Sequence, residues 1–120
     1  MSNTKIVQVI NTMISNKEKI SQVIREDNEF YFLYDNKFKW SILFSGDEYY
    51  IKFYPKDDIQ IYDIPSQTSW GGYKDFVLYS TEELKTREAR ETFAELYQVT
   101  ADQLYGIDDI FDSIIGDDLF

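Results

Sequence analysis

The sequence predicts an α+β fold: an N-terminal helix, an antiparallel meander sheet of four to five strands, then one long and one short acidic C-terminal helix. Residues 28–55 contain three aromatic-rich runs separated by polar clusters at 35–37 and 45–48, a pattern typical of a three-stranded antiparallel meander. Apolar residues recur at helical spacing before this stretch, and a helix-capping sequence follows it. We expect one small domain over residues 1–120 with an acidic amphipathic segment at 107–120.

Residues 3–25 are expected to form the N-terminal helix, because apolar residues recur there at steps of three and four. Ser15 and Asn16 mark a point where this helix can kink or break. An amphipathic helix next to an aromatic sheet usually covers that sheet. The alternative is a detachable helix that binds a partner.

The middle run of the meander alternates most clearly, with Phe38, Trp40, Ile42 and Phe44 on one face. This period of two predicts a sheet with one side against a core. Residues 59–62 are expected to form a short fourth strand and residues 76–79 a fifth. Between them, Trp70 and Tyr73 flank two glycines in an expected loop, as binding anchors or as plugs for the end of the sheet.

A capping box at Ser80 and Glu83 predicts a helix that runs to about Gln98. A short helical turn is expected from Thr100 to Gly106. Residues 107–120 then contain five aspartates and no lysine or arginine, so that half of the net charge of −10 lies there. The apolar residues of this segment form a narrow helical stripe: Ile107, Ile110, Phe111, Ile114 and Ile115. Docking of this helix on the core is the favoured expectation for Ile107, Ile110 and Ile114.

Composition excludes several classes of function. The chain has no histidine and no cysteine, which removes the usual general base, the usual nucleophile pairs and thiolate metal sites. Phosphate-binding glycine loops and calcium loops are also missing from the sequence, so we expect no enzyme, no cofactor and no metal. The net charge disfavours duplex DNA and anionic membranes. The absence of a recognisable targeting segment suggests a cytoplasmic protein.

The function that we expect is a non-enzymatic acidic protein-binding module. It would be an inhibitor or adaptor of the nucleic-acid-mimic, immunity or anti-defence type. It would engage a basic surface of a partner protein such as a nuclease or another nucleic-acid-binding protein. The candidate binding residues are Asp108, Asp109, Phe111, Asp112, Asp117 and Asp118, with Trp70 and Tyr73 as further anchors. The aspartates can equally be solvated charges on a docked helix.

The alternative function is single-stranded nucleic-acid binding with an acidic partner-docking tail. Strand alternation predicts that five residues share the face opposite Trp40: Tyr31, Lys39, Tyr50, Lys52 and Tyr54. Tyrosines can stack on bases and lysines can contact phosphates. These residues can also be ordinary solvent-facing strand residues, or lie beneath the second helix.

The last five residues, from Gly116 to Phe120, resemble the acidic, phenylalanine-terminated tip of bacterial single-stranded-DNA-binding proteins. In that family the tip docks replication and repair enzymes. The resemblance covers only these residues, lacks the penultimate proline, and follows an apolar stripe instead of a long linker. We therefore do not assign the chain to that family.

Overall fold

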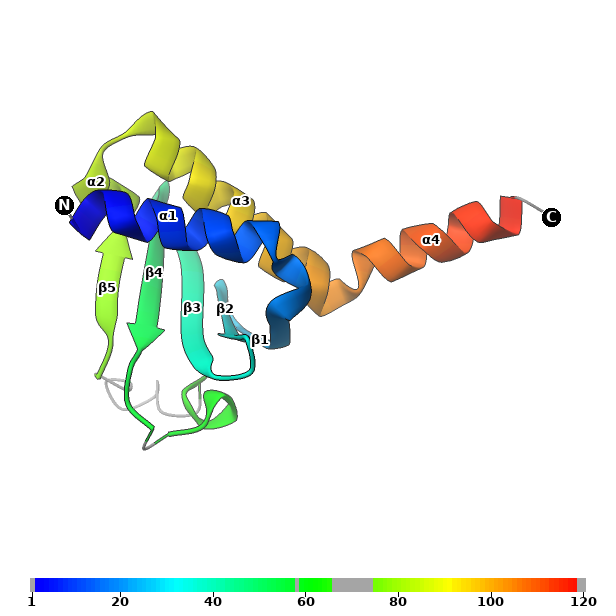
Figure 1. Ribbon diagram of the computed structural model, residues 1–120, viewed down its shortest axis with the longest axis horizontal. Helices are drawn as coiled ribbons and strands as arrows, with labels where there is room; N and C mark the ends of the chain where they lie inside the picture. The colour runs from blue at the N-terminus through cyan, green and yellow to red at the C-terminus, as the bar shows by residue number, and fades with distance from the viewer. Residues whose placement is uncertain (1, 58, 66–74, 119–120) are drawn as a thin grey trace.

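The computed structural model describes residues 2–57, 59–65 and 75–118 and confirms the α+β prediction (Figure 1). The helices are α1 (Ser2–Ser15), α2 (Thr81–Leu84), α3 (Arg87–Tyr105) and α4 (Ile107–Asp118). The strands are β1 (Ile20–Glu26), β2 (Glu29–Tyr34), β3 (Phe38–Ser45), β4 (Glu48–Tyr54) and β5 (Val77–Ser80). Two short 3-10 turns are η1 (Lys17–Lys19) and η2 (Ile61–Asp63).

The N-terminal helix is shorter than predicted. It ends at Ser15, the anticipated weak point, where the Asn16 side-chain amide donates to the Thr12 carbonyl oxygen at 2.9 Å. Residues 20–25, predicted as helix, instead belong to β1, which pairs antiparallel with β2. The β-branched residues Ile20, Val23 and Ile24 suit a strand at least as well as a helix. The antiparallel pairing with β2 stabilises the strand over the helix in this segment.

The five strands form one antiparallel sheet in the order β1-β2-β3-β4-β5. Both predicted turns of the meander are present. Asp35 and Asn36 adopt positive φ in the first turn, and Gly46 and Asp47 do so in the second. Aspartate, asparagine and glycine tolerate positive φ better than other residues do. Tight hairpin turns with positive φ match the right-handed twist of the flanking strands, so these residues favour the two hairpins.

The expected strand at residues 59–62 is wrong. The 3-10 turn η2 begins within this stretch, and Ile61 and the following Ile64 are buried against the side of the sheet opposite to α1. Their apolar side chains therefore pack down on the sheet, and the backbone does not extend its edge. The fifth strand expected near residues 76–79 is confirmed as β5, which pairs with β4.

The main core lies between the sheet and the pair α1 and α3, which both cover the same face (Figure 1). Its fully buried members include Ile10, Phe32, Ile42, Ile51 and Phe93. The alternation in β3 therefore predicted the correct core face, with Trp40 and Ile42 buried. Phe38 and Phe44 lie on the same face near the two ends of β3, and both are exposed.

The predicted helix after Ser80 begins where expected, because the Ser80 hydroxyl accepts a hydrogen bond from the Glu83 amide at 3.2 Å. This helix, α2, is only one turn long, since Lys85 adopts the left-handed conformation. Thr86 then caps α3, which continues without a break through residues 98–100 to Tyr105. The predicted end at Gln98 is wrong because Val99 and Leu104 continue the face that packs on the core.

Candidate partner-binding surfaces

Helix α4 extends away from the rest of the molecule (Figure 1). Gly106 has φ 64° and ends α3, with its N–H directed to the carbonyl oxygens of Asp102 and Gln103. A left-handed glycine in this position stops one helix and lets the chain leave in a new direction. The sequence therefore places a sharp change of direction before the acidic segment.

The apolar stripe of α4 is exposed. The exposed fractions of the residues in this stripe are Ile110 49%, Phe111 56%, Ile114 61% and Ile115 59%. The expectation that Ile110 and Ile114 dock on the core is therefore wrong, and Ile107 is only half-buried. α1 and α3 pack on the covered face of the sheet, and α4 does not join them there.

Aspartates are interspersed with this stripe along the sequence of α4. Asp108, Asp109 and Asp112 are exposed, and the Asp108 carboxylate lies 3.6 Å from the ammonium of Lys17. Asp108 and Asp109 are in the first turn, where a carboxylate stabilises a helix through its dipole. Asp117 and Asp118 belong to the last turn, where the helix dipole disfavours negative charge. Helix stability therefore does not account for these last two acids.

The other two predicted anchors, Trp70 and Tyr73, lie outside the described residues. The choice between anchor and plug for this pair stays a prediction. Among the described residues, the candidate partner-binding surface therefore consists of α4 alone.

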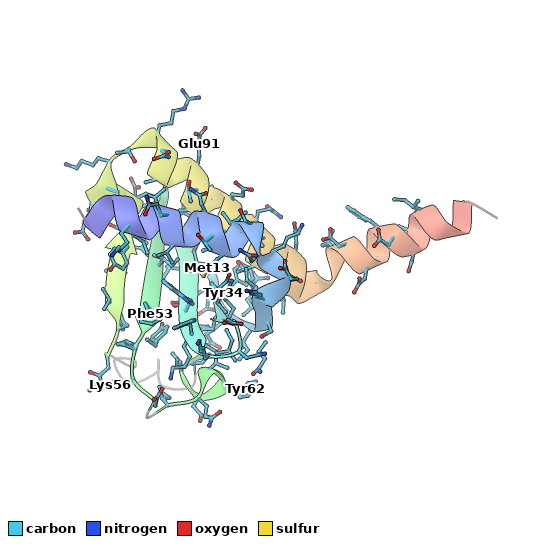
Figure 2. All side chains as sticks on the ribbon, in the orientation of Figure 1. Met13, Tyr34, Phe53, Lys56, Tyr62 and Glu91 are labelled. Atoms are coloured by element: carbon cyan, nitrogen blue, oxygen red, sulfur yellow. The ribbon has the colours of Figure 1, made fainter. Side chains whose placement is uncertain are left out.

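A second surface, which the sequence did not reveal, is an apolar groove of about 500 Å³ between α1 and the sheet. Its lining residues are Lys5, Gln8, Val9, Thr12, Met13, Tyr34, Phe38, Trp40 and Phe53. In Figure 2, Met13, Tyr34 and Phe53 lie on this side of the sheet, below α1. A smaller hollow of about 180 Å³ continues the groove to Val77 and Tyr79 of β5.

The groove exists because α1 crosses only part of the sheet (Figure 1). Phe38, at the start of β3, is 40% exposed, and Val77, at the start of β5, is 44% exposed. Trp40 also lines the groove, and its buried indole N–H has no hydrogen-bond acceptor in the described part of the chain. The pattern in β3 predicted an apolar face, but the position at which α1 crosses the strands decides how much of it stays open.

The five residues of the alternative nucleic-acid face do share one side of the sheet, as predicted. Register places Ser41 between Tyr31 and Lys52, and Lys39 next to Tyr54. The expectation that this side is open is wrong for three of the five, because Tyr31, Lys39 and Tyr54 are buried. The cover is the segment with Ile61 and Ile64, joined by Phe76, and not the second helix. Tyr50 and Lys52 are half-buried.

The covered face contains a cluster of polar side chains that contact one another. The Glu29 carboxylate accepts hydrogen bonds from the hydroxyls of Tyr31 at 3.0 Å and Ser41 at 2.6 Å, and lies 3.3 Å from the Lys52 ammonium. Burial, followed by the charge of Glu29, raises the pKa of Tyr31 well above its ordinary value, and burial does the same for the pKa of Tyr54. Every polar group named here has a partner within the cluster. The arrangement therefore holds the fold together and offers no free nucleophile.

The ammonium of Lys39 also faces inward, where it donates hydrogen bonds to the carbonyl oxygens of Lys56 and Ile59. This lysine therefore ties the segment after β4 to the sheet. An ammonium engaged in this way is not available to a phosphate group.

A crevice of about 330 Å³ at the junction of α3 and α4 is lined by Asp102, Asp108 and Asp109 among others. Across the described ranges, no group of three or more histidine, cysteine or acidic side chains is arranged to hold a metal ion. In the same ranges no helix is both long enough and apolar enough to cross a bilayer.

Comparison with known protein families, curated proteins and solved structures finds no significant match to this chain.

Proposed function

We propose that this chain is a non-enzymatic protein-binding module that presents α4 to a basic, partly apolar surface of a partner protein. One observation carries the proposal: four large apolar side chains on α4 are about half exposed or more, and aspartates flank them. An exposed contiguous apolar surface with a charged rim is typical of a protein-interaction site. The module would act as an inhibitor or as an adaptor.

Burial of the apolar stripe would provide the stability of such a complex. Full burial of a large apolar side chain contributes about 1.5–3 kcal/mol before the entropic costs of association are subtracted. Phe111 and Ile114, at 56% and 61% exposure, are the strongest candidates for these central contacts. The stripe alone can therefore support binding of useful strength.

The aspartates would supply attraction and selectivity. Charges at the rim of an interface mainly increase the association rate and reject partners of like charge. Asp117 and Asp118 sit where they oppose the helix dipole, so a role in binding gives a reason for their presence that helix stability does not. A surface that evolved to hold phosphates would attract this segment, which favours a nuclease or another nucleic-acid-binding protein as the partner.

The experiment uses three full-length forms of the chain as bait in lysate of the source cell, and mass spectrometry identifies the bound proteins. The first is wild type. The second carries Asp108→Asn, Asp109→Asn and Asp112→Asn. The third is a matched control in which three exposed acids of α3 lose their charge: Glu88→Gln, Glu91→Gln and Glu95→Gln.

The affinity of the purified partner is then measured at low and at physiological salt. We expect the α4 variant to lose at least about tenfold in affinity, equivalent to about 1.4 kcal/mol. The wild-type affinity should fall as salt screens the aspartates. An affinity that is the same for the α4 variant and for wild type would refute the proposal, whatever the partner is.

A further inference from the structure

We propose that the apolar groove beneath α1 receives α4 of a second copy of this chain, so that the free protein forms a reciprocal dimer. Each α4 would lie in the groove of the other copy. The inference deepens the proposed function, on which it rests, because the helix that would engage a partner is the one that the dimer covers.

The two surfaces match in chemical character. Apart from Lys5, Gln8 and Thr12, the groove is lined by large apolar and aromatic side chains, Phe38 and Trp40 among them. The exposed stripe of α4 consists of three isoleucines and one phenylalanine. An amphipathic helix that places such a stripe in an apolar groove is a common mode of recognition.

The two surfaces also match in length. The residues of α1 that line the groove run from Lys5 to Met13, which is about 12 Å along a helix axis at 1.5 Å per residue. The exposed stripe from Ile110 to Ile115 spans about 8 Å on the same scale. The stripe therefore fits within the groove without leaving an apolar end uncovered.

Charge is complementary as well. Lys5 lines the groove, and the ammonium of Lys37 lies 5.0 Å from the ring centroid of Phe38 at its edge. None of the described residues that line the groove is acidic, although the whole chain has 22 acids in 120 residues. A helix with aspartates and no basic residue suits this rim, which identifies α4 as the occupant that the chain itself supplies.

The occupant must come from a second copy, because the structure holds each α4 away from its own groove. The Gly106 cap directs α4 outward (Figure 1), and the Ile110 N–H donates to the Gly106 carbonyl oxygen at 3.1 Å. Lys17 lies near Asp108 and adds a second tie at the same junction. Two copies that each supply one helix and one groove form an isologous contact that closes on itself.

The dimer has a consequence for regulation. The apolar stripe of α4 would be covered in the free protein, and a partner with a basic groove would have to displace the second copy. Dimer formation and partner binding would therefore compete for α4 by mass action.

The experiment measures the mass of the full-length chain in solution over a wide concentration range by analytical ultracentrifugation. A helix variant carries Phe111→Ser and Ile114→Ser, and a groove variant carries Lys5→Glu and Phe38→Ser. A control variant, Leu78→Ser, changes a side chain on β5 that is 43% exposed and does not line the groove. Circular dichroism and thermal unfolding verify that each variant is folded.

We expect wild type and the control to reach twice the mass of the chain, with at least about a tenfold weaker association for either variant. A mixture of the helix variant and the groove variant should recover association, because one helix and one groove remain intact in the mixed pair. If the groove variant dimerises like wild type, as it would for direct α4–α4 packing, the inference is wrong.

A chain that stays monomeric at every concentration also overturns the inference. In that case the bait experiment still decides the proposed function, since α4 can bind a partner without a dimer. Conversely, a dimer that is sensitive to both variants, together with a failed bait experiment, would leave the dimer standing and remove the proposed function.

Discussion

Glu29 is the residue that connects the buried polar cluster on the face opposite to α1. Its carboxylate lies within hydrogen-bonding distance of two hydroxyls, on Tyr31 and Ser41, and it forms an ion pair with Lys52. The Ser41 hydroxyl oxygen in turn lies 2.8 Å from the Tyr54 hydroxyl. A buried charge is tolerated only when partners replace water in this way. The segment with Ile61, Ile64 and Phe76 closes this face over the cluster, although the face is rich in tyrosine and lysine.

Tyr31 gives this cluster a dependence on alkaline pH. Its folded-state pKa is raised above the value of about 10 for an unfolded tyrosine. The stabilising contribution is therefore complete below pH 10 and is lost as the pH rises above it, because the unfolded chain ionises first. We expect wild type to lose roughly 1.4 kcal/mol more than Tyr31→Phe between pH 8 and pH 11.

Urea unfolding at the two pH values measures this difference, with Tyr62→Phe as the control at an exposed position. At pH 8 the Tyr31→Phe variant should be less stable by about 1 kcal/mol, since it lacks the hydrogen bond to Glu29. Parallel pH dependences for wild type and Tyr31→Phe would contradict the prediction.

The joint between α2 and α3 shows how single residues set the bounds of an element. Lys85 has φ 57°, which ends α2, and the Thr86 hydroxyl accepts a hydrogen bond from the Ala89 amide at 3.0 Å. The cap therefore starts a new helix after only two intervening residues. This second start places Ala89, Phe93 and Leu96 on the core side of α3.

Replacing the cap should destabilise the protein in a graded manner. We expect Thr86→Ala to lower the free energy of unfolding by about 1 kcal/mol, because one amide of the first turn loses its acceptor. Thr86→Ser keeps a hydroxyl at the same position and should stay within about 0.5 kcal/mol of wild type. Urea unfolding of the three proteins tests this, and equal losses for both variants would show that the cap is not the cause.

The whole molecule is more extended than its length requires. Its radius of gyration is 15.4 Å, and its principal extents are 52 × 33 × 27 Å. A compact domain of this length has a radius of gyration of about 13.6 Å. Helix α4 accounts for the difference, since it leaves the two-layer body at Gly106 (Figure 1).

Removal of α4 should therefore leave the body stable. We expect a chain that ends at Gly106 to differ from wild type by less than about 1 kcal/mol in free energy of unfolding, because α4 buries few side chains. The comparison uses concentrations at which the full chain is monomeric. Phe93→Ala, in the fully buried part of α3, should cost about 3–5 kcal/mol and shows the size of a true core loss. A comparable loss on truncation would mean that α4 is docked.

Local features of the fold followed from the sequence alone. The turns at residues 35–36 and 46–47, the cap at Ser80 and the helix end at Gly106 depend on residues whose own backbone or side-chain chemistry favours those conformations. The alternation in residues 38–44 assigned the core face because side chains alternate along a strand. The acidic stripe of residues 107–115 could also be read directly, since it is a matter of helical spacing.

Only the tertiary structure decided the remaining points, because each depends on what packs against a segment that suits two states. Residues 20–26 form a strand since β2 offers them a pairing edge, and Ile61 and Ile64 turn inward to cover Tyr31 and Tyr54. The groove appears where the strands extend beyond the line along which α1 crosses them. The exposure of α4 follows from the left-handed cap at Gly106, which directs the helix away from the core, so the apolar stripe predicted from spacing does not pack on its own chain.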